Sequence, residues 1–146
     1  MKNSNYITVE FMSKSTNEAF ARTAVACFAA QLDPTLDELG DIKTAVSEAV
    51  TNAIVHAYPD TLGKISMKMR ILDASTIEVS IRDWGQGIED ISKARQPMYT
   101  TGGEERSGMG FTIMESFMDK LSVRSTPNKG TRVTMRKKIN SRQAIK

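Results

Sequence analysis

Three polar residues, Glu48, Asn52 and His56, follow one another at intervals of four in a segment with helical periodicity. Rotation by about 100° per residue places this acid, amide and imidazole on one stripe of the helix, beside an apolar stripe. The amide oxygen of Asn52 could bind Mg²⁺, and a carboxylate one turn away could take a proton from an attacking hydroxyl or water. In an isolated helix the same pattern is more often a polar border of the core, so the rest of the chain has to decide.

A second group of residues, Asp83-Trp-Gly85-Gln-Gly87, closes an alternating strand. Asp83 is in phase with Ile77 and Ile81, which places its carboxylate on the buried face, where it needs polar partners. Backbone amides could supply them, and so could a ligand amine such as the exocyclic amine of adenine. The two glycines allow the backbone to approach a flat ring closely.

A third group, Gly108-Met109-Gly110, precedes a helix that begins near Phe111. Exposed amides at a helix N-terminus suit phosphate oxygens, although a lone G-x-G is weak evidence and lacks the third glycine of the dinucleotide fingerprint. Arg106 could reach a terminal phosphate from this position, as an arginine finger does, or be an ordinary exposed loop residue.

Caps, breakers and periodicity indicate the elements that must position these groups. Capping boxes at Ser15–Glu18 and Thr35–Glu38 predict two helices, and Pro59 ends the second one. The predicted helices span residues 15–32, 35–58 and 111–118, and the predicted strands span 6–12, 64–71, 77–81, 120–125 and 131–139. A polar, glycine-bearing loop is expected over residues 84–107. We expect an α+β two-layer sandwich with helices on one face of a mainly antiparallel mixed sheet.

Bulk composition predicts a single domain over residues 1–146, with a core of ordinary size. The single cysteine, Cys27, lies in an apolar stretch and is expected to be a small buried hydrophobe. No signal peptide or membrane span is evident, which favours the cytoplasm. The net charge is +3, and much of the basic excess lies from Arg132 onward. We interpret this run as a solvated edge strand and tail, and predict no direct contact with nucleic acid or membrane.

These motifs together resemble those of the GHKL ATPase/kinase superfamily, the fold of histidine-kinase catalytic domains. Glu48 and Asn52 match the N-box, Asp83, Gly85 and Gly87 match the G1 box, and Gly108 and Gly110 match the G2 box. Segments 17–22, 31–39 and 106–119 are similar to the anti-sigma F factor family of spore-forming bacteria. The resemblance implies a Bergerat ATP-binding fold, with ATP or ADP and Mg²⁺ as cofactors.

The resemblance also implies a role for each matching residue. Glu48 is the implied catalytic base, Asn52 the magnesium ligand, Asp83 the adenine ligand and Arg106 the γ-phosphate contact. Arg22 aligns with a residue that contacts the sigma factor. Other implied nucleotide contacts are Gly85, Gly87, Thr100, Thr101, Gly108, Met109, Gly110 and Thr131. After Thr101 the family tends to have lysine and proline, where this chain has Gly102-Gly103, so we expect a more mobile nucleotide lid.

The function implied by the resemblance is twofold. The protein would bind and inhibit a sporulation sigma factor, and would phosphorylate a serine of an anti-anti-sigma factor. A homodimer is expected, with the first strand and first helix as its interface. Two alternatives stay open: a nucleotide-gated sigma-binding module without turnover, and a stress-response switch kinase acting on a different sigma factor.

Overall fold

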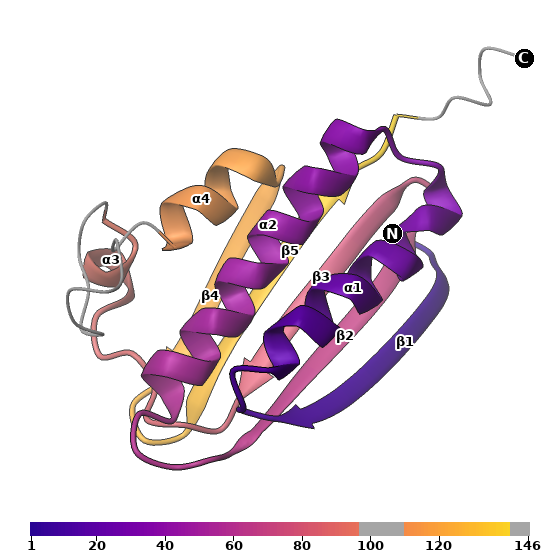
Figure 1. Cartoon of the computed structure of the whole chain (residues 1–146). Helices are drawn as coiled ribbons and strands as arrows, with labels where there is room; N and C mark the ends of the chain where they lie inside the picture. The colour runs from indigo at the N-terminus through magenta and orange to yellow at the C-terminus, as the bar shows by residue number, and fades with distance from the viewer. Residues whose placement is uncertain (97–109, 141–146) are drawn as a thin grey trace, which may run out of the picture.

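The fold consists of one five-stranded sheet with helices packed on one of its faces (Figure 1). The structure is a computed structural model, and it describes residues 1–96 and 110–140. The strands are β1 Asn3–Met12, β2 Lys64–Leu72, β3 Thr76–Asp83, β4 Lys120–Thr126 and β5 Gly130–Lys138. The helices are α1 Asn17–Ala29, α2 Leu36–Asn52, α3 Ile91–Ala94 and α4 Gly110–Phe117, with a 3-10 turn Ala30–Leu32 and a π-helical turn Ala53–Ala57.

The strand order is β1-β2-β3-β5-β4, and every pairing among the described strands is antiparallel. The predicted α+β sandwich is therefore confirmed, although no parallel pair occurs in the described part of the sheet. Both predicted hairpins, β2–β3 and β4–β5, are present. Because β5 lies between β3 and β4, the end of β3 lies next to the start of β5, and this junction positions the site described below.

The core lies between the sheet and the three longer helices. Figure 1 shows α2 between α1 and α4, all in front of the same face of the sheet. The predicted apolar stripe of α2 is buried: Ile42, Val46 and Val50 are fully covered. They pack with the alternating residues of β2 and β3, among them Ile65 and Ile81. Burial of one such aliphatic side chain contributes about 1.5–3 kcal/mol, so this layer fixes α2 firmly on the sheet.

The start of α2 matches the prediction, whereas the start of α1 does not. At α2, the Glu38 N–H donates to Thr35 Oγ1 at 3.0 Å and the Thr35 N–H donates to Glu38 Oε1 at 2.8 Å, which is a complete capping box. At α1 the N-cap is Thr16 and no side chain caps the helix. The predicted box at Ser15 is wrong because Glu18 instead approaches Arg22, one turn further on, with an N–O distance of 3.5 Å.

Two further expectations are corrected by the packing. Cys27 is exposed, because the buried face of α1 is formed by Ala21, Val25 and Phe28, and Cys27 lies off that stripe. The basic strand β5 is not an edge strand, since it pairs with β3 on one side and β4 on the other. Within residues 1–96 and 110–140, no helix is long and apolar enough to cross a membrane.

Candidate nucleotide site

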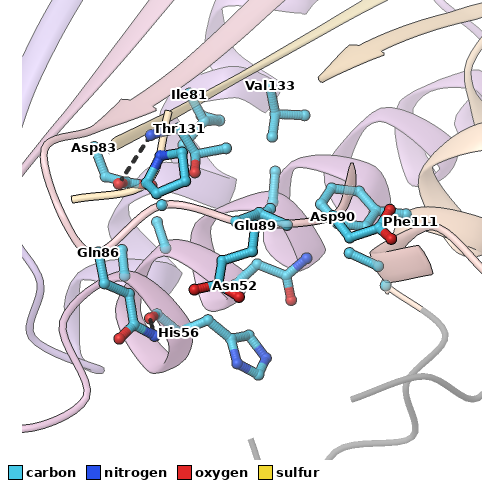
Figure 2. Close-up of a pocket in the computed structure, with 18 of the residues that line it drawn as sticks. Asn52, His56, Ile81, Asp83, Gln86, Glu89, Asp90, Phe111, Thr131 and Val133 are labelled. Atoms are coloured by element: carbon cyan, nitrogen blue, oxygen red, sulfur yellow. Dashed lines mark hydrogen bonds between the residues drawn. The ribbon is translucent and has the colours of Figure 1, made fainter. Parts of the chain in front are cut away.

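A cleft of about 500 Å³ opens between the C-terminal end of α2, the end of β3, the start of α4 and the β4–β5 turn. Figure 2 shows that its labelled side chains come from elements that are far apart in sequence. The size falls within the usual range for small-molecule sites. Five predicted site residues line the cleft: Asn52, Asp83, Gly87, Gly110 and Thr131.

Asp83 is the buried carboxylate of the site, with 6% of its surface exposed, as its phase in the strand predicted. Its Oδ1 accepts hydrogen bonds from the Gly85 N–H at 3.0 Å and from the Thr131 N–H at 3.2 Å. Figure 2 shows the bond from Thr131. In the described part of the chain, Oδ2 accepts no hydrogen bond. Burial raises the pKa of Asp83, and the two backbone hydrogen bonds oppose that rise. A carboxylate held in this way can offer its second oxygen to a ligand amine.

The two glycines after Asp83 fit against neighbouring backbone. A Cβ atom at Gly85 would collide with the Ala57 carbonyl, and Gly87 adopts a φ of +76°, in the left-handed region that favours glycine. The turn is fixed to the β4–β5 hairpin, because the Ile88 N–H donates to Ser125 Oγ at 2.7 Å. Gly85 itself supports the cleft wall, while Gly87 lines it.

Asn52 and Gly110 meet at the opposite end of the cleft. A Cβ atom at Gly110 would lie 3.0 Å from Asn52 Nδ2 and 3.2 Å from Asn52 Oδ1. Glycine at the start of α4 therefore allows that helix N-terminus to approach the Asn52 amide closely. The sequence placed these residues in two separate motifs, and the fold brings them into contact range.

The end of α2 changes from an α-helix to a π-helical turn over Ala53–Ala57. Such turns are rare and often occur at functional sites. His56 lies in this turn and lines the cleft, as Asn52 does. The turn is attached to the glycine-rich segment, since Gln86 Nε2 donates to the His56 carbonyl at 2.6 Å and the Gln86 N–H donates to the Ala57 carbonyl at 3.1 Å. Periodicity alone predicted a regular helix here and could not reveal the extra residue in the turn.

Glu48 and Arg22 do not line the cleft. Glu48 is half-buried on α2, one turn before Asn52, while its neighbour Ala49 forms part of the cleft wall. Arg22 lies on α1, from which no residue lines the cleft, and its side chain is 44% exposed. The remaining predicted contacts, Thr100, Thr101, Arg106, Gly108 and Met109, lie outside the described residues, as does the Gly102-Gly103 departure.

The apolar walls of the cleft were missed by the sequence reasoning. Ile81 and Val133 are directly paired across β3 and β5, and Phe111 covers the cleft from α4. The polar rim was missed too: Glu89 and Asp90 line the cleft, and Asp90 caps α3 by accepting from the Lys93 N–H at 3.0 Å. Alternation along β5 could have indicated Val133, two residues after Thr131. The short helix α3 lies in the segment 84–107 that the sequence predicted to be a loop.

The arrangement suits a flat, amine-bearing ring joined to an anionic tail. Ile81 and Val133 offer apolar surface beside the Asp83 carboxylate, and Asn52 lies at the α4 end of the cleft. No cluster of three or more His, Cys, Asp or Glu side chains that could hold a metal occurs in the described residues. A lone amide ligand fits Mg²⁺, which keeps most of its coordination positions for water and phosphate oxygens.

Residues 11–137 match the family described as the histidine kinase-like ATPase domain. The fold and the cleft therefore define a domain of this ATPase class. An anti-sigma F factor from Caldanaerobacter subterraneus subsp. tengcongensis is 58% identical over 95% of this chain and 97% of its own length. An anti-sigma F factor from Clostridium botulinum is 57% identical over 93% of this chain and 96% of its own length. The chain belongs to the anti-sigma F factor family of histidine kinase-like ATPase domains.

Solved structures share the fold at low sequence identity. The RsbU and RsbW domains of a Mycobacterium tuberculosis protein superpose with a TM-score of 0.69 at 17% identity, over 95% of this chain and 34% of that chain. The mycobacterial sensor histidine kinase MprB superposes with a TM-score of 0.59 at 15% identity, over 94% of this chain and 99% of that chain. Both confirm the predicted Bergerat-type architecture.

Proposed function

We propose that the whole chain forms one domain, an anti-sigma factor that is also an ATP-dependent serine kinase. It would bind a sporulation sigma factor and phosphorylate an anti-anti-sigma factor in the cytoplasm of a spore-forming bacterium. The observation that carries this proposal is the buried Asp83 carboxylate, whose Oδ1 is held by the Gly85 and Thr131 amides in a cleft of about 500 Å³. The identity to anti-sigma F factors supports the sigma partner.

In the proposed complex, Asp83 accepts a hydrogen bond from the adenine amine, and the apolar surfaces of Ile81 and Val133 lie against the ring. The phosphates extend toward Asn52 and Gly110, at the other end of the cleft. Asn52 would hold Mg²⁺, which neutralises phosphate charge when bound. Arg106 would contact the γ-phosphate.

The proposed reaction transfers the γ-phosphoryl group to a serine hydroxyl of the anti-anti-sigma factor. Glu48 takes the serine proton, the serine oxygen bonds to the γ-phosphorus, and the bond between that phosphorus and the bridging oxygen breaks to release ADP. Glu48 is assigned this role because it is half-buried on the same helix as Asn52, one turn before it. A general base of this type contributes about 10²–10⁴ in rate.

Sigma binding is assigned to the α1 surface, which carries the exposed Arg22. A homodimer would use the same region: β1 is a sheet edge among the described strands, and Ile7, Met12 and Phe20 are exposed near it. Because ADP lacks the γ-phosphate, the two nucleotides should give different sigma affinities. A coupling of about 1–3 kcal/mol would provide a usable switch.

The switch is tested by measuring the affinity of the sigma factor with saturating ATP, saturating ADP and no nucleotide. The proposal predicts tighter binding with ATP by about 5- to 150-fold. Equal affinity with ATP and ADP would refute the switch. Phosphoryl transfer that Glu48→Ala abolishes supports the kinase, whereas a nucleotide-dependent sigma affinity without any transfer supports the alternative of a gated binding module.

A further inference from the structure

The sheet face opposite the helices is open and strongly basic. Residues that are directly paired in the ladder point to the same face, so the register sorts the side chains of this face into rows. Basic side chains outnumber acidic ones on it. Its basic residues are Lys64, Lys68, Arg70, Arg82, Lys120, Arg124, Arg132, Arg136 and Lys138, and its acidic residues are Glu10 and Glu78.

One row of this face is electrostatically compensated. Glu78, which is only 5% exposed, lies between its two directly paired neighbours Arg70 and Arg136. Arg70 Nη2 is 2.6 Å and Arg136 Nε is 2.7 Å from the Glu78 oxygens. The buried carboxylate of Glu78 thus forms an ion pair with each of the two arginines beside it.

In a second row the acid is further away: Glu10 on β1 is separated from the nearest arginine by Ser66 on β2, and it pairs with Lys64 at 3.8 Å. Arg132 on β5 is directly paired with Arg82 on β3 and with Arg124 on β4, so three arginine residues are neighbours across three strands. None of the three forms an ion pair with a carboxylate in residues 1–96 or 110–140. Like charges directly opposite each other destabilise a sheet. This arginine row (Arg82, Arg132, Arg124) therefore costs stability unless an anion from outside the chain contacts it.

The face is also hollowed next to the arginine row. A trough of about 440 Å³ is lined by basic, acidic and hydroxyl side chains, and the basic ones are more numerous than the acidic ones. Its lining consists of Lys68, Arg70, Arg82 and Arg132, the acids Glu10 and Glu78, the hydroxyl residues Thr8, Ser66 and Ser80, and Trp84. Arg82 lies over the Trp84 ring, 4.6 Å from its centroid, and Lys64 lies over the same ring at 4.3 Å. A cation held against an aromatic ring loses some of its freedom before any ligand binds.

We propose that this trough binds an acidic segment of a protein partner, with its carboxylates on the arginine row. Arginine guanidinium groups pair with carboxylates bidentately, and the hydroxyl side chains that line the trough can donate further hydrogen bonds. A second copy whose two-fold axis passes through the arginine row would bring that row against itself, which is repulsive. Proteins that bind single-stranded nucleic acid stack successive bases on a series of aromatic rings, whereas the described part of this face carries two, Tyr6 and Trp84, each with a cation over its ring. This inference does not depend on the nucleotide cleft.

The test measures the binding of a fluorescein-labelled peptide of twelve glutamates to the full chain at low ionic strength, with fluorescence anisotropy as the readout. The double variant Arg82→Gln/Arg132→Gln removes two charges from the trough. The matched control Lys2→Gln/Lys14→Gln removes two charges from exposed positions outside it. We expect the trough variant to weaken binding by at least about tenfold and the control by less than about twofold.

Equal weakening in both variants would overturn the proposal, because net charge and not the trough would then govern binding. A twelve-nucleotide oligothymidine that binds more tightly than the peptide, and loses binding only in the trough variant, would replace the acidic segment with nucleic acid. A change in oligomeric state of the trough variant in sedimentation would assign the face to a second copy. ATP binding and thermal midpoint serve as folding checks, and Arg124→Gln alone provides a milder variant if the double variant is unfolded.

Discussion

Replacement of Asp83 by asparagine separates the ligand role of this residue from its structural role. Asp83 Oδ1 accepts from the Gly85 N–H at 3.0 Å and from the Thr131 N–H at 3.2 Å. An asparagine oxygen can keep both bonds. Its amide nitrogen then takes the place of Oδ2, so that a donor replaces the acceptor that would receive the adenine amine.

The expected loss follows from one charge-assisted hydrogen bond. Such a bond contributes about 1.5–3 kcal/mol, which corresponds to a weakening of ATP affinity by about 10- to 150-fold. The unliganded protein should be equally stable or slightly more stable, because the neutral amide avoids the burial of a carboxylate that is 6% exposed. Asp83→Ala should instead leave the Gly85 and Thr131 amides without their acceptor, at a cost of about 1–3 kcal/mol each.

Calorimetric titration with ATP and thermal unfolding without nucleotide measure both effects. Asp83→Asn should lose affinity and keep its thermal midpoint, whereas Asp83→Ala should lose both. If Asp83→Asn bound ATP as tightly as the wild type, the assignment of Asp83 as the adenine ligand would be refuted. A midpoint as low as that of Asp83→Ala would refute the reasoning that Oδ1 carries the structural role.

The same carboxyl group gives stability a pH dependence of known sign. Burial raises the pKa of Asp83 in the folded protein above the ordinary value of 3.8. Between those two pKa values the folded state binds more protons than the unfolded state, so its free energy of unfolding falls as the pH rises through that window. ATP affinity should instead fall as the pH is lowered, because Asp83 then becomes protonated. Urea unfolding at several pH values should show this pH dependence of the free energy of unfolding in the wild type and not in Asp83→Asn. The same pH dependence in both proteins would show that Asp83 is not the group responsible.

Three further substitutions test the contact between Gly110 and Asn52 in the cleft and the charge pairs on the open face. Gly110→Ala places a Cβ atom 3.0 Å from Asn52 Nδ2, so Mg²⁺-dependent ATP affinity should fall by about tenfold with little change in stability, and an unchanged affinity would contradict the role of this contact. Arg136→Gln removes one of the two partners of the buried Glu78 and should cost about 1–3 kcal/mol in urea unfolding. Arg132→Gln should be neutral or stabilising by up to about 1 kcal/mol, since it relieves like-charge pairing, and equal losses in both variants would contradict the row-by-row charge balance.

Local patterns predicted the parts of the fold that depend on local interactions. The Thr35–Glu38 capping box, the burial of Asp83 and the two hairpins followed from spacing and alternation, and all are present. The position of β5 inside the sheet depends on pairing with β3, which is distant in sequence and leaves no local signal. For the same reason, the arginine row could not be read from the chain.

Competition between local interactions explains two other differences. Glu18 has a choice between capping α1 and approaching Arg22, and periodicity does not rank the two. The π-helical turn at Ala53–Ala57 is held from outside the helix, by hydrogen bonds from Gln86, so the helix sequence alone does not specify it. The site was thus predictable as a set of residue types, while its walls and the shape of the turn required the fold.

Transfer of label from γ-labelled ATP to a purified anti-anti-sigma factor, in the presence of Mg²⁺, tests the central claim most directly. The wild type should label a serine of the acceptor, and Glu48→Ala should reduce the rate by about 10²–10⁴ while still binding ATP. Asp83→Asn, assayed at an ATP concentration below its raised dissociation constant, is the control that shows how the rate falls when nucleotide binding is lost. Transfer that is unchanged in Glu48→Ala would contradict the assigned base, and an absence of transfer by a wild-type protein that binds ATP would contradict the kinase.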